Sequence, residues 1–282
     1  MQRRAPAKIN LYLHVTGKRA DGYHQLETLV VFADLGDVLS VTPSESLTLT
    51  VTGAFADEAG SGAENLVLRA AEALRAATGI RAGAALVLEK NLPVGAGLGG
   101  GSADAAAALK LLMTHWAVIL PQAQLMKIAS ALGADVPICL TGTPLIARGV
   151  GQEISLPSAA LPELHLVLVY PHTPLATKDV FARYRIERQI ATPSLDFSSA
   201  EKFCMSLAPA RNQLQPVAIS LLPEVAEVLL ALETAPQARL VRMTGSGSAC
   251  FAITSDAQDA HHLAQYLTQR YPHWWVRAVR AA

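Results

Sequence analysis

This 282-residue sequence has few cysteines and no excess of either charge, and each of these features excludes some classes of protein. The three cysteines are odd in number, far apart and outside any C-x-x-C pair: Cys139, Cys204 and Cys250. We therefore expect no disulfide framework and a protein of the reducing cytoplasm. The 23 basic and 23 acidic residues balance, so no net charge directs the chain toward nucleic acid or an anionic membrane. Any anion that binds must therefore be recognised by local geometry.

Long hydrophobic runs are also missing. No segment approaches the ~20 consecutive apolar residues of a membrane span. Two arginines precede an apolar stretch near the N-terminus, but Lys8, Asn10 and His14 interrupt that stretch too early for a signal peptide. With 51% hydrophobic and 16% charged residues, the composition indicates a soluble globular chain of one or two domains.

Hydrophobic periodicity predicts an α+β protein with two domains, 1–150 and 151–282. Alternating residues predict antiparallel strands in the first part of the chain. The expected helices and later strands follow the order helix 65–78, helices 102–117 and 121–132, a turn-rich piece at 133–142, strand 165–171, several helices within 176–235, a strand pair within 239–254, helix 256–270 and strand 274–281.

The stretch "PVGAGLGGGSADAAAALKLL", residues 93–112, places five glycines within seven positions directly before strong helix formers. Glycine can adopt positive φ and lets a ligand lie against backbone N–H groups. With Ser102 as the expected N-cap, the positive end of the new helix would point into this loop. This arrangement is typical of a phosphate-binding site.

Two familiar glycine loops do not fit. The stretch 95–100 satisfies G-x-G-x-x-G, yet about 90 residues precede it and a second helix, rather than a strand, follows. A P-loop requires Gly-Lys-Ser/Thr, where this chain has Gly100-Gly101-Ser102. The H-R-D and D-F-G motifs of protein kinases are also missing from the sequence.

Three other stretches carry polar groups. Lys8, Asn10, Tyr12 and His14 share one face of an expected strand, which is either a functional face or a solvated one. Asp135 in "GADVP" is either a half-buried carboxylate that needs a partner or a helix-capping residue. The segment 245–248, "GSGS", is either a hairpin loop or a second anion cradle.

Together these motifs resemble the GHMP kinases, which phosphorylate small molecules with a glycine loop unlike the P-loop. The resemblance spans nearly the whole chain through "APAKINLYLHVTGKRADGYHQLETL", "PVGAGLGGGSADAAAAL" and "MTGSGSACFA". It implies a two-domain GHMP kinase fold, with an N-terminal ATP-binding domain like the second domain of ribosomal protein S5 and a ferredoxin-like C-terminal domain. It also implies ATP as phosphoryl donor and Mg²⁺, with metal ligands that remain unknown.

The resemblance assigns the catalytic roles to Lys8 and Asp135. Asp135 would accept the proton of the substrate hydroxyl, and Lys8 would offset charge on the reacting oxygens, in keeping with phosphoryl transfer by positioning and charge stabilisation. The ATP-binding residues implied by the resemblance are Asn65, Leu66, Lys90, Pro93, Val94, Gly95, Ala96, Gly97, Leu98, Gly99, Gly100, Gly101, Ser102 and Ala103.

Within the family, "DGYH" at 21–24 indicates a member that acts on a cytidine compound. Tyr23 would stack on cytosine, His24 would hydrogen-bond its edge, and Phe181 would cover the other face. Asn10 would line the pocket for the remainder of the substrate. A buried core pair is the alternative for Tyr23 and His24, but the preceding Arg-Ala-Asp-Gly favours a loop.

Other functions stay open at this point. A GHMP kinase for homoserine or a mevalonate-type alcohol would keep the glycine loop without "DGYH", and an inactive nucleotide-binding regulator would need neither Lys8 nor Asp135. Ala96 replaces a glycine common in relatives, which is harmless if its φ is negative. Asp104 is expected either to assist Mg²⁺ or to be an exposed acid in the first helical turn. The oligomeric state is not determined by these patterns.

Overall fold

The computed structural model describes residues 1–186 and 190–282, which form two compact units. Unit 1 consists of Met1–Lys8, Gly36–Val94 and Gly99–Gly142. Unit 2 consists of Ile9–Leu35, Gly95–Leu98 and Thr143–Ala282. The units are interleaved because the long strands β1 (Gln2–Lys18) and β2 (His24–Thr42) each contribute to both.

Unit 1 contains a sheet in which the end of β2 pairs with β4 (Ala84–Glu89), and β4 pairs with β3 (Leu47–Thr52). The β3–β4 pair is parallel, and the connection between these strands contains α1 (Ala56–Ala59) and α2 (Leu66–Thr78). Alternate residues of β4 are buried, as expected for a sheet with one covered face.

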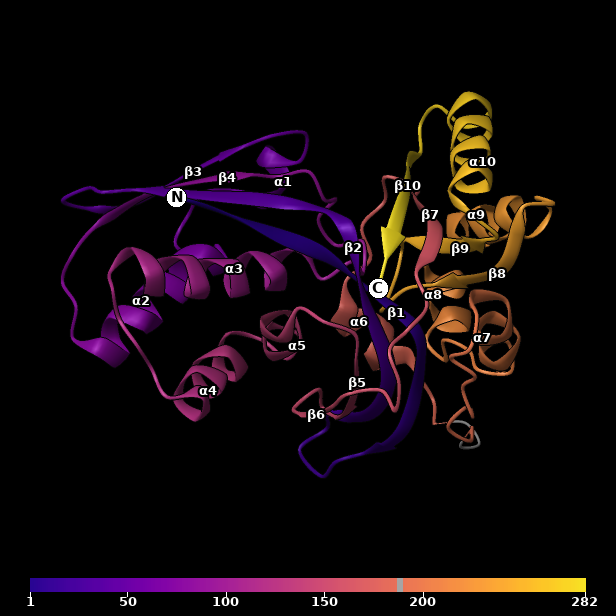
Figure 1. Cartoon of the computed structure of the whole chain (residues 1–282), viewed down its shortest axis with the longest axis horizontal. Helices are drawn as coiled ribbons and strands as arrows, with labels where there is room; N and C mark the ends of the chain where they lie inside the picture. Colours follow the sequence, from indigo (N-terminus) through magenta and orange to yellow (C-terminus); the bar gives the residue numbers. More distant parts are fainter. Residues whose placement is uncertain (187–189) are drawn as a thin grey trace. The chain divides into compact units, whose positions relative to one another are not determined.

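The helices α2 and α3 (Gly100–His115) lie on one side of this sheet in unit 1, and α4 (Gln122–Leu132) and α5 (Val136–Thr141) pack against them (Figure 1). The central helix is α3, which packs against α2 and α5. Its run of alanines and leucines from 105 to 109 is buried on every side, because small side chains let neighbouring helices approach closely. The helix that follows the glycine loop is therefore rigidly embedded.

Unit 2 contains an antiparallel sheet in which β7 (Leu164–Tyr170) lies between β10 (Trp275–Ala281) and β9 (Cys250–Thr254). β8 (Ala238–Met243) pairs with β9. The start of β2 pairs with β5 (Leu145–Gly149), and β5 pairs with β6 (Glu153–Ser155). Helices α9 (Glu224–Glu233) and α10 (Ala257–Arg270) pack against this sheet.

The remaining helices of unit 2 precede α9 in the chain. They are α6 (Thr177–Arg183), α7 (Ala200–Leu207) and α8 (Gln215–Leu221). The apolar residues of α6, α8 and α9 join those of β7, β8 and β9 in a common core. The candidate site residue Phe181, on α6, packs against this core.

Most of the expected elements are confirmed. The predicted helices 65–78, 121–132 and 256–270 match α2, α4 and α10 within one residue at each end. The turn-rich expectation for 133–142 is wrong, because residues 136–141 form α5 with proline in its first turn, where a missing N–H is tolerated. The interleaved units do not correspond one to one with 1–150 and 151–282, and that linear boundary stays a prediction.

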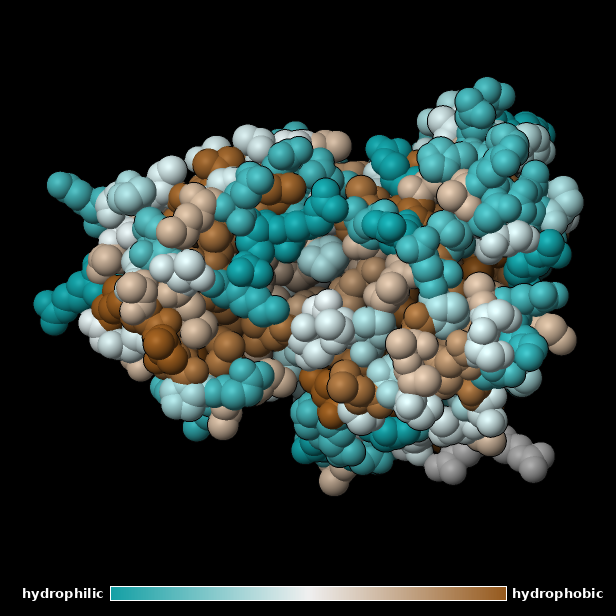
Figure 2. All heavy atoms as spheres, viewed as in Figure 1, coloured by the Kyte–Doolittle hydropathy of each residue, from teal (hydrophilic) through white to brown (hydrophobic). Residues whose placement is uncertain are grey.

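The described residues contain no helix long and apolar enough to cross a membrane. On the face shown in Figure 2, hydrophobic residues occur as separate patches among hydrophilic ones. Cys139, Cys204 and Cys250 are free thiols and all three are buried, and burial raises the pKa of each thiol.

Candidate active site

The glycine loop has the backbone conformation that its composition predicts. Gly95, Gly97 and Gly99 have φ of 70°, 79° and 66°, values that side chains with a Cβ rarely adopt. Among the described residues other than glycine, only Ala117 and His172 have positive φ, so Ala96 replaces a glycine without strain.

The helix that follows the loop begins earlier than expected. α3 starts at Gly100 with Gly99 at its N-cap, so the prediction of Ser102 as N-cap is wrong. The first intrahelical bond runs from the N–H of Ala103 to the carbonyl of Gly99, at 2.9 Å. The N–H groups before Ala103 are therefore those available to an anion at the helix start. A left-handed Gly99 replaces the serine side chain as the device that turns the chain into the helix.

The first part of the loop packs against the "GSGS" segment. The N–H of Ala249 donates to the carbonyl of Ala96 at 2.9 Å, and the N–H of Leu175 donates to that of Gly95 at 3.1 Å. A Cβ on Gly97 would lie 2.5 Å from the carbonyl oxygen of Thr244, which forbids any side chain there. The segment 245–248 connects the paired strands β8 and β9, so it is a hairpin loop, and it supports the glycine loop.

Side chains on the remaining loop residues point into the protein. Pro93, Ala96 and Leu98 are buried, while Val94 is half-buried. The apolar side chains of the loop are therefore turned away from solvent, as a phosphate cradle made of backbone groups requires.

Lys8 and Asp135 form an ion pair in unit 1, with Lys8 Nζ 3.1 Å from Asp135 Oδ2. The Lys8 side chain is 5% exposed and that of Asp135 is 42% exposed, so the carboxylate remains accessible to a substrate. A Cβ on Gly99 would lie 3.0 Å from Lys8 Cε, which places the lysine stem against the N-cap of α3. The structure thus brings both predicted catalytic residues and the start of α3 together.

Asp135 occupies the N-cap position of α5 without capping it. Its side chain makes no hydrogen bond to the helix and reaches Lys8 instead. The capping alternative is therefore wrong, and the expectation of a half-buried carboxylate with a partner is confirmed.

The polar face of β1 is buried rather than solvated. Lys8, Asn10, Tyr12 and His14 are each at most 4% exposed. The side-chain amide of Asn10 donates to Thr28 Oγ1 at 2.8 Å, and that hydroxyl donates to the carbonyl of Tyr12. Buried polar groups need partners, and this small network fixes the orientation of Asn10.

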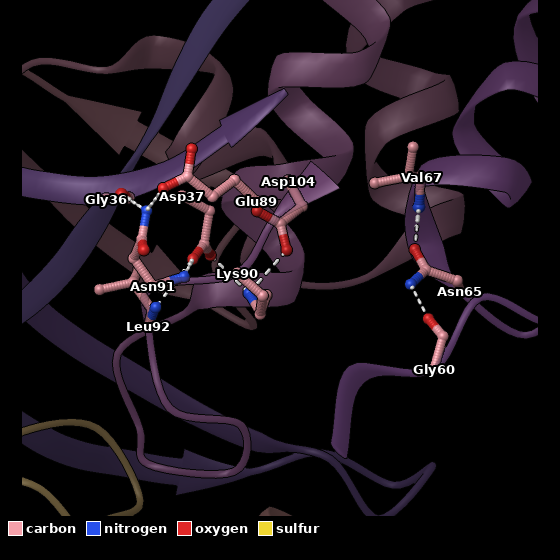
Figure 3. Close-up of polar contacts among 10 residues, drawn as sticks. All are labelled: Gly36, Asp37, Gly60, Asn65, Val67, Glu89, Lys90, Asn91, Leu92 and Asp104. Atoms are coloured by element: carbon pink, nitrogen blue, oxygen red, sulfur yellow. Dashed lines mark hydrogen bonds and ion pairs between the residues drawn. The ribbon is translucent and has the colours of Figure 1, made fainter. Parts of the chain in front are cut away.

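Lys90 lies in a cluster that the sequence did not predict (Figure 3). Its ammonium group contacts Asp37 Oδ2 at 2.5 Å and Asp104 Oδ2 at 2.7 Å, and all three residues are at most 3% exposed. The expectation of an exposed acid at 104 is therefore wrong. The backbone N–H of Lys90 donates to the carbonyl of Thr52, and the carbonyl of Lys90 accepts from the N–H of Phe55. These bonds fix the backbone of Lys90, and its contact with adenine stays a prediction.

Asp37 could have been suspected, because an acid inside the apolar stretch "LGDVLSV" must find a partner when buried. Which cation it meets depends on the pairing of β2 with β4, which places Val38 opposite Glu89. The sequence offers no local signal for that register.

Asn65 and Leu66 lie at the start of α2. The Asn65 side chain accepts from the N–H of Val67 at 2.9 Å and donates to the carbonyl of Gly60 at 2.8 Å, as Figure 3 shows. It therefore caps α2. A Cβ on Gly101 would lie 3.5 Å from Leu66 Cδ1, so Leu66 borders the first turn of α3.

The predicted base-recognition residues belong to unit 2. Tyr23 is 65% exposed on the loop before β2, so the alternative of a buried core pair is wrong. The His24 and Phe181 rings lie 5.2 Å apart at 30°. Burial and the positive charge of Lys18 lower the pKa of His24, which keeps its imidazole neutral at pH 7, with one donor and one acceptor.

Glu27, a buried acid in unit 2, was also not predicted by the sequence analysis. Glu27 accepts from Thr192 Oγ1 at 2.6 Å, from Arg148 Nε at 2.8 Å and from the Tyr12 hydroxyl at 3.3 Å. These hydrogen bonds and the Arg148 charge hold the pKa of Glu27 below its ordinary value although burial opposes them. The cluster fastens β5 and the segment around 192 to β1 and β2.

Two family models match the chain. The model of the GHMP kinases N terminal domain matches residues 65–143, and that of the GHMP kinases C terminal matches residues 191–273. The chain belongs to the GHMP kinase family, and the expected two-domain α+β fold of that family is confirmed.

Among curated relatives, the 4-diphosphocytidyl-2-C-methyl-D-erythritol kinase of Paramagnetospirillum magneticum is 48% identical over 96% of this chain and 95% of its own length. The enzyme of the same name from Chelativorans sp. is 46% identical over 98% and 94%. A crystal structure of 4-(cytidine 5'-diphospho)-2C-methyl-D-erythritol kinase superposes with a TM-score of 0.83 at 36% identity, covering 100% of this chain and 99% of that one. A homoserine kinase from Cytophaga hutchinsonii, at 19% identity and a TM-score of 0.73 over 100% and 94%, shares the fold.

Proposed function

We propose that this protein is an ATP-dependent kinase that phosphorylates a hydroxyl of 4-diphosphocytidyl-2-C-methyl-D-erythritol, the 2-hydroxyl by resemblance, in non-mevalonate isoprenoid precursor synthesis. The observation that carries the kinase chemistry is the Lys8–Asp135 ion pair against the N-cap of α3. The substrate follows from the names of relatives that match nearly the full length of the chain.

The proposed reaction needs little covalent chemistry from the protein. Asp135 accepts the proton of the attacking hydroxyl, and the Lys8 ammonium offsets negative charge on the reacting oxygens. The N–H groups at the start of α3 and the bare backbone of the glycine loop hold the ATP phosphates. Asn65, Leu66 and Lys90 are proposed to lie near the adenine.

Mg²⁺ is proposed to be held mainly by the phosphates of ATP, whose charge it neutralises. The described residues contain no group of three or more His, Cys, Asp or Glu side chains that could hold a metal ion. Mg²⁺ bound through one or two carboxylates and substrate phosphates suits such a site. Asp135, which pairs with Lys8 and keeps an accessible carboxylate, could contribute one ligand.

Recognition of the cytidine part is proposed for the loop before β2. The neutral His24 can match a donor and an acceptor on the cytosine edge, and the exposed Tyr23 ring and the Phe181 ring supply stacking surfaces. Asn10, fixed by Thr28, is proposed to face the methylerythritol part. The proposed partner is a small-molecule substrate, with no nucleic acid or membrane. The proposed location is the cytoplasm, where the three free thiols would stay reduced.

A comparison of substrates tests this proposal. We expect ATP consumption with 4-diphosphocytidyl-2-C-methyl-D-erythritol to exceed that with mevalonate or homoserine by at least ~10³-fold in kcat/KM, because polar recognition of a base discriminates strongly. Efficient phosphorylation of mevalonate or homoserine would identify another kinase of the family. Nucleotide binding without turnover of any of the three alcohols would instead favour a regulator.

The base-recognition role makes a narrower prediction. His24→Ala should raise KM for the cytidine substrate about 5- to 10-fold, as loss of one hydrogen bond worth about 1 kcal/mol predicts, while KM for ATP and kcat stay near their wild-type values. Steady-state kinetics with each substrate varied in turn measures this. The exposed His261→Ala on α10 is the matched control. An equal rise in both KM values would remove His24 from base recognition.

A further inference from the structure

The buried cluster of Asp37, Lys90 and Asp104 joins the two ends of the glycine loop (Figure 3). Asp37 Oδ1 accepts from the N–H groups of Asn91 and Leu92, at 2.6 and 2.8 Å, where the chain leaves β4. Asp104 lies in the second turn of α3, beyond the other end of the loop. Lys90 bonds to both acids, so one ammonium group links the two stems.

The link lies directly beneath the proposed phosphate site. A Cβ on Gly100, the first residue of α3, would be 3.0 Å from Lys90 Nζ and 3.6 Å from Asp37 Oδ2. A shift of the Lys90 ammonium would therefore also displace Gly100, whose N–H group is the first of the helix. All these groups belong to unit 1.

Charge balance does not explain Asp104. Lys90 and Asp37 form a one-to-one ion pair, and Asp37 receives two further backbone donors. Asp104 adds a second carboxylate with Oδ2 on Lys90 and Oδ1 buried with no hydrogen-bond partner. Burying an additional acid is unfavourable, and the bond from Lys90 to Asp104 on α3 indicates a tie to the helix rather than a balance of charge.

We propose that Asp104 is a positioning residue, which ties α3 to the β4 stem through Lys90 and Asp37 and so fixes the spacing of the N–H groups that hold the ATP phosphates. This inference rests on the proposed function. Misplacement by about 1 Å in a site of this kind lowers rates by up to ~10²-fold, so a tie at the base of the loop has a large effect on phosphates that are held by backbone N–H groups.

Two substitutions separate the contact between Lys90 and residue 104 from the negative charge of the Asp104 carboxylate. Asp104→Asn keeps an oxygen for Lys90 Nζ, and Asp104→Leu removes it while leaving Lys90 paired with Asp37. We expect Asp104→Leu to raise the Kd and KM for ATP at least ~10-fold and Asp104→Asn to stay within ~3-fold, with KM for the cytidine substrate unchanged in both. Calorimetric ATP titration and steady-state kinetics provide the values.

Leu112→Ala is the control for loss of helix packing, because Leu112 is buried in α3 about two turns beyond Asp104. It should lower the melting temperature and leave ATP affinity unchanged. The positioning role is refuted if Asp104→Leu binds ATP as the wild type does, if Asn and Leu weaken binding equally, or if Leu112→Ala weakens it as much. Failure of the wild type to bind ATP would refute the proposed function itself.

A pH measurement gives an independent check, even if Asp104→Leu does not fold. Asp104 faces Lys90 and Asp37, and the Cys139 thiol lies nearby on α5. Burial, opposed by Lys90 and reinforced by Asp37, raises the pKa of Asp104 to about 7. The folded protein therefore binds more protons than the unfolded chain between about pH 4 and 7, and stability contributed by this group is lost as pH rises.

Wild-type stability should then fall more steeply between pH 4 and 7 than that of Asp104→Asn, which has no proton to lose, when urea unfolding is compared across that range. Carboxyl groups outside the cluster affect both proteins alike and cancel in the difference. Equal pH dependence in the two proteins would place Asp104 outside the buried cluster and overturn the proposal.

Discussion

Asp135→Asn is expected to lower kcat by at least ~10²-fold while ATP binding and the melting temperature stay close to those of the wild type. The side chain is 42% exposed and makes no capping bond, so the fold does not depend on its charge. Asparagine keeps the shape and an oxygen for Lys8 Nζ but cannot accept the hydroxyl proton. A single-turnover measurement with saturating ATP isolates the chemical step.

Glu72→Gln is the matched control, since Glu72 is an exposed acid on α2 that pairs only weakly with Arg75 at 3.3 Å. Its kcat should equal that of the wild type. Lys8→Ala should resemble Asp135→Asn in kcat, because both residues are proposed to act in the same transfer step. Turnover within about threefold of wild type in Asp135→Asn would exclude this carboxylate as the general base.

Gly99→Val is expected to weaken ATP binding by at least ~10²-fold, the second large effect. The residue has φ of 66°, where a β-branched side chain is strongly disfavoured, and its Cβ would lie 3.0 Å from Lys8 Cε. Valine would therefore both distort the N-cap of α3 and displace Lys8, the proposed catalytic lysine. Calorimetric titration with ATP, and separately with the cytidine substrate, measures the change.

Gly79→Val separates backbone strain from the ligand effect. Gly79 has φ of 73° at the C-cap of α2, and a Cβ there would meet nothing within 4 Å. It should lower stability by about 1–2 kcal/mol and leave ATP binding unaltered. If Gly99→Val weakened both ligands equally, the loss would reflect damage to the fold, and the loop would not be a phosphate cradle.

Local sequence signals were sufficient to predict the helices that have clear capping and helix-ending residues. α2 could be placed because Asn65 caps its start and Gly79 ends it, and α4 because Pro121 and Gly133 flank an amphipathic stretch. The same signals misplaced the start of α3. A left-handed glycine can serve as N-cap, and nothing in "GLGGGS" distinguishes Gly99 from the serine that usually takes this position.

The candidate site was predictable where one short motif supplies the geometry, as in the loop 95–101, whereas the sequence left open whether the polar face of β1 is solvated. The roles of Lys8 and Asp135 came from family resemblance, because the 126 intervening residues carry no local record of the contact between them. Asp37 and Glu27 were missed for a related reason. Each is an acid in a strand whose partners lie on other elements, and strand register is set by tertiary packing rather than by neighbours in sequence.

The interleaving of the two compact units limits how this enzyme can be recombined with its relatives. The chain passes from one unit to the other at 8/9, 35/36, 94/95, 98/99 and 142/143. A chimaera made by one crossover at residue 150 would therefore combine strands 9–35 of one parent with the β7–β10 sheet of the other inside a single hydrophobic core. Exchanging a whole unit requires a separate crossover at every one of these positions, including two within the glycine loop, so relatives would be expected to diverge in the two units together rather than by shuffling them.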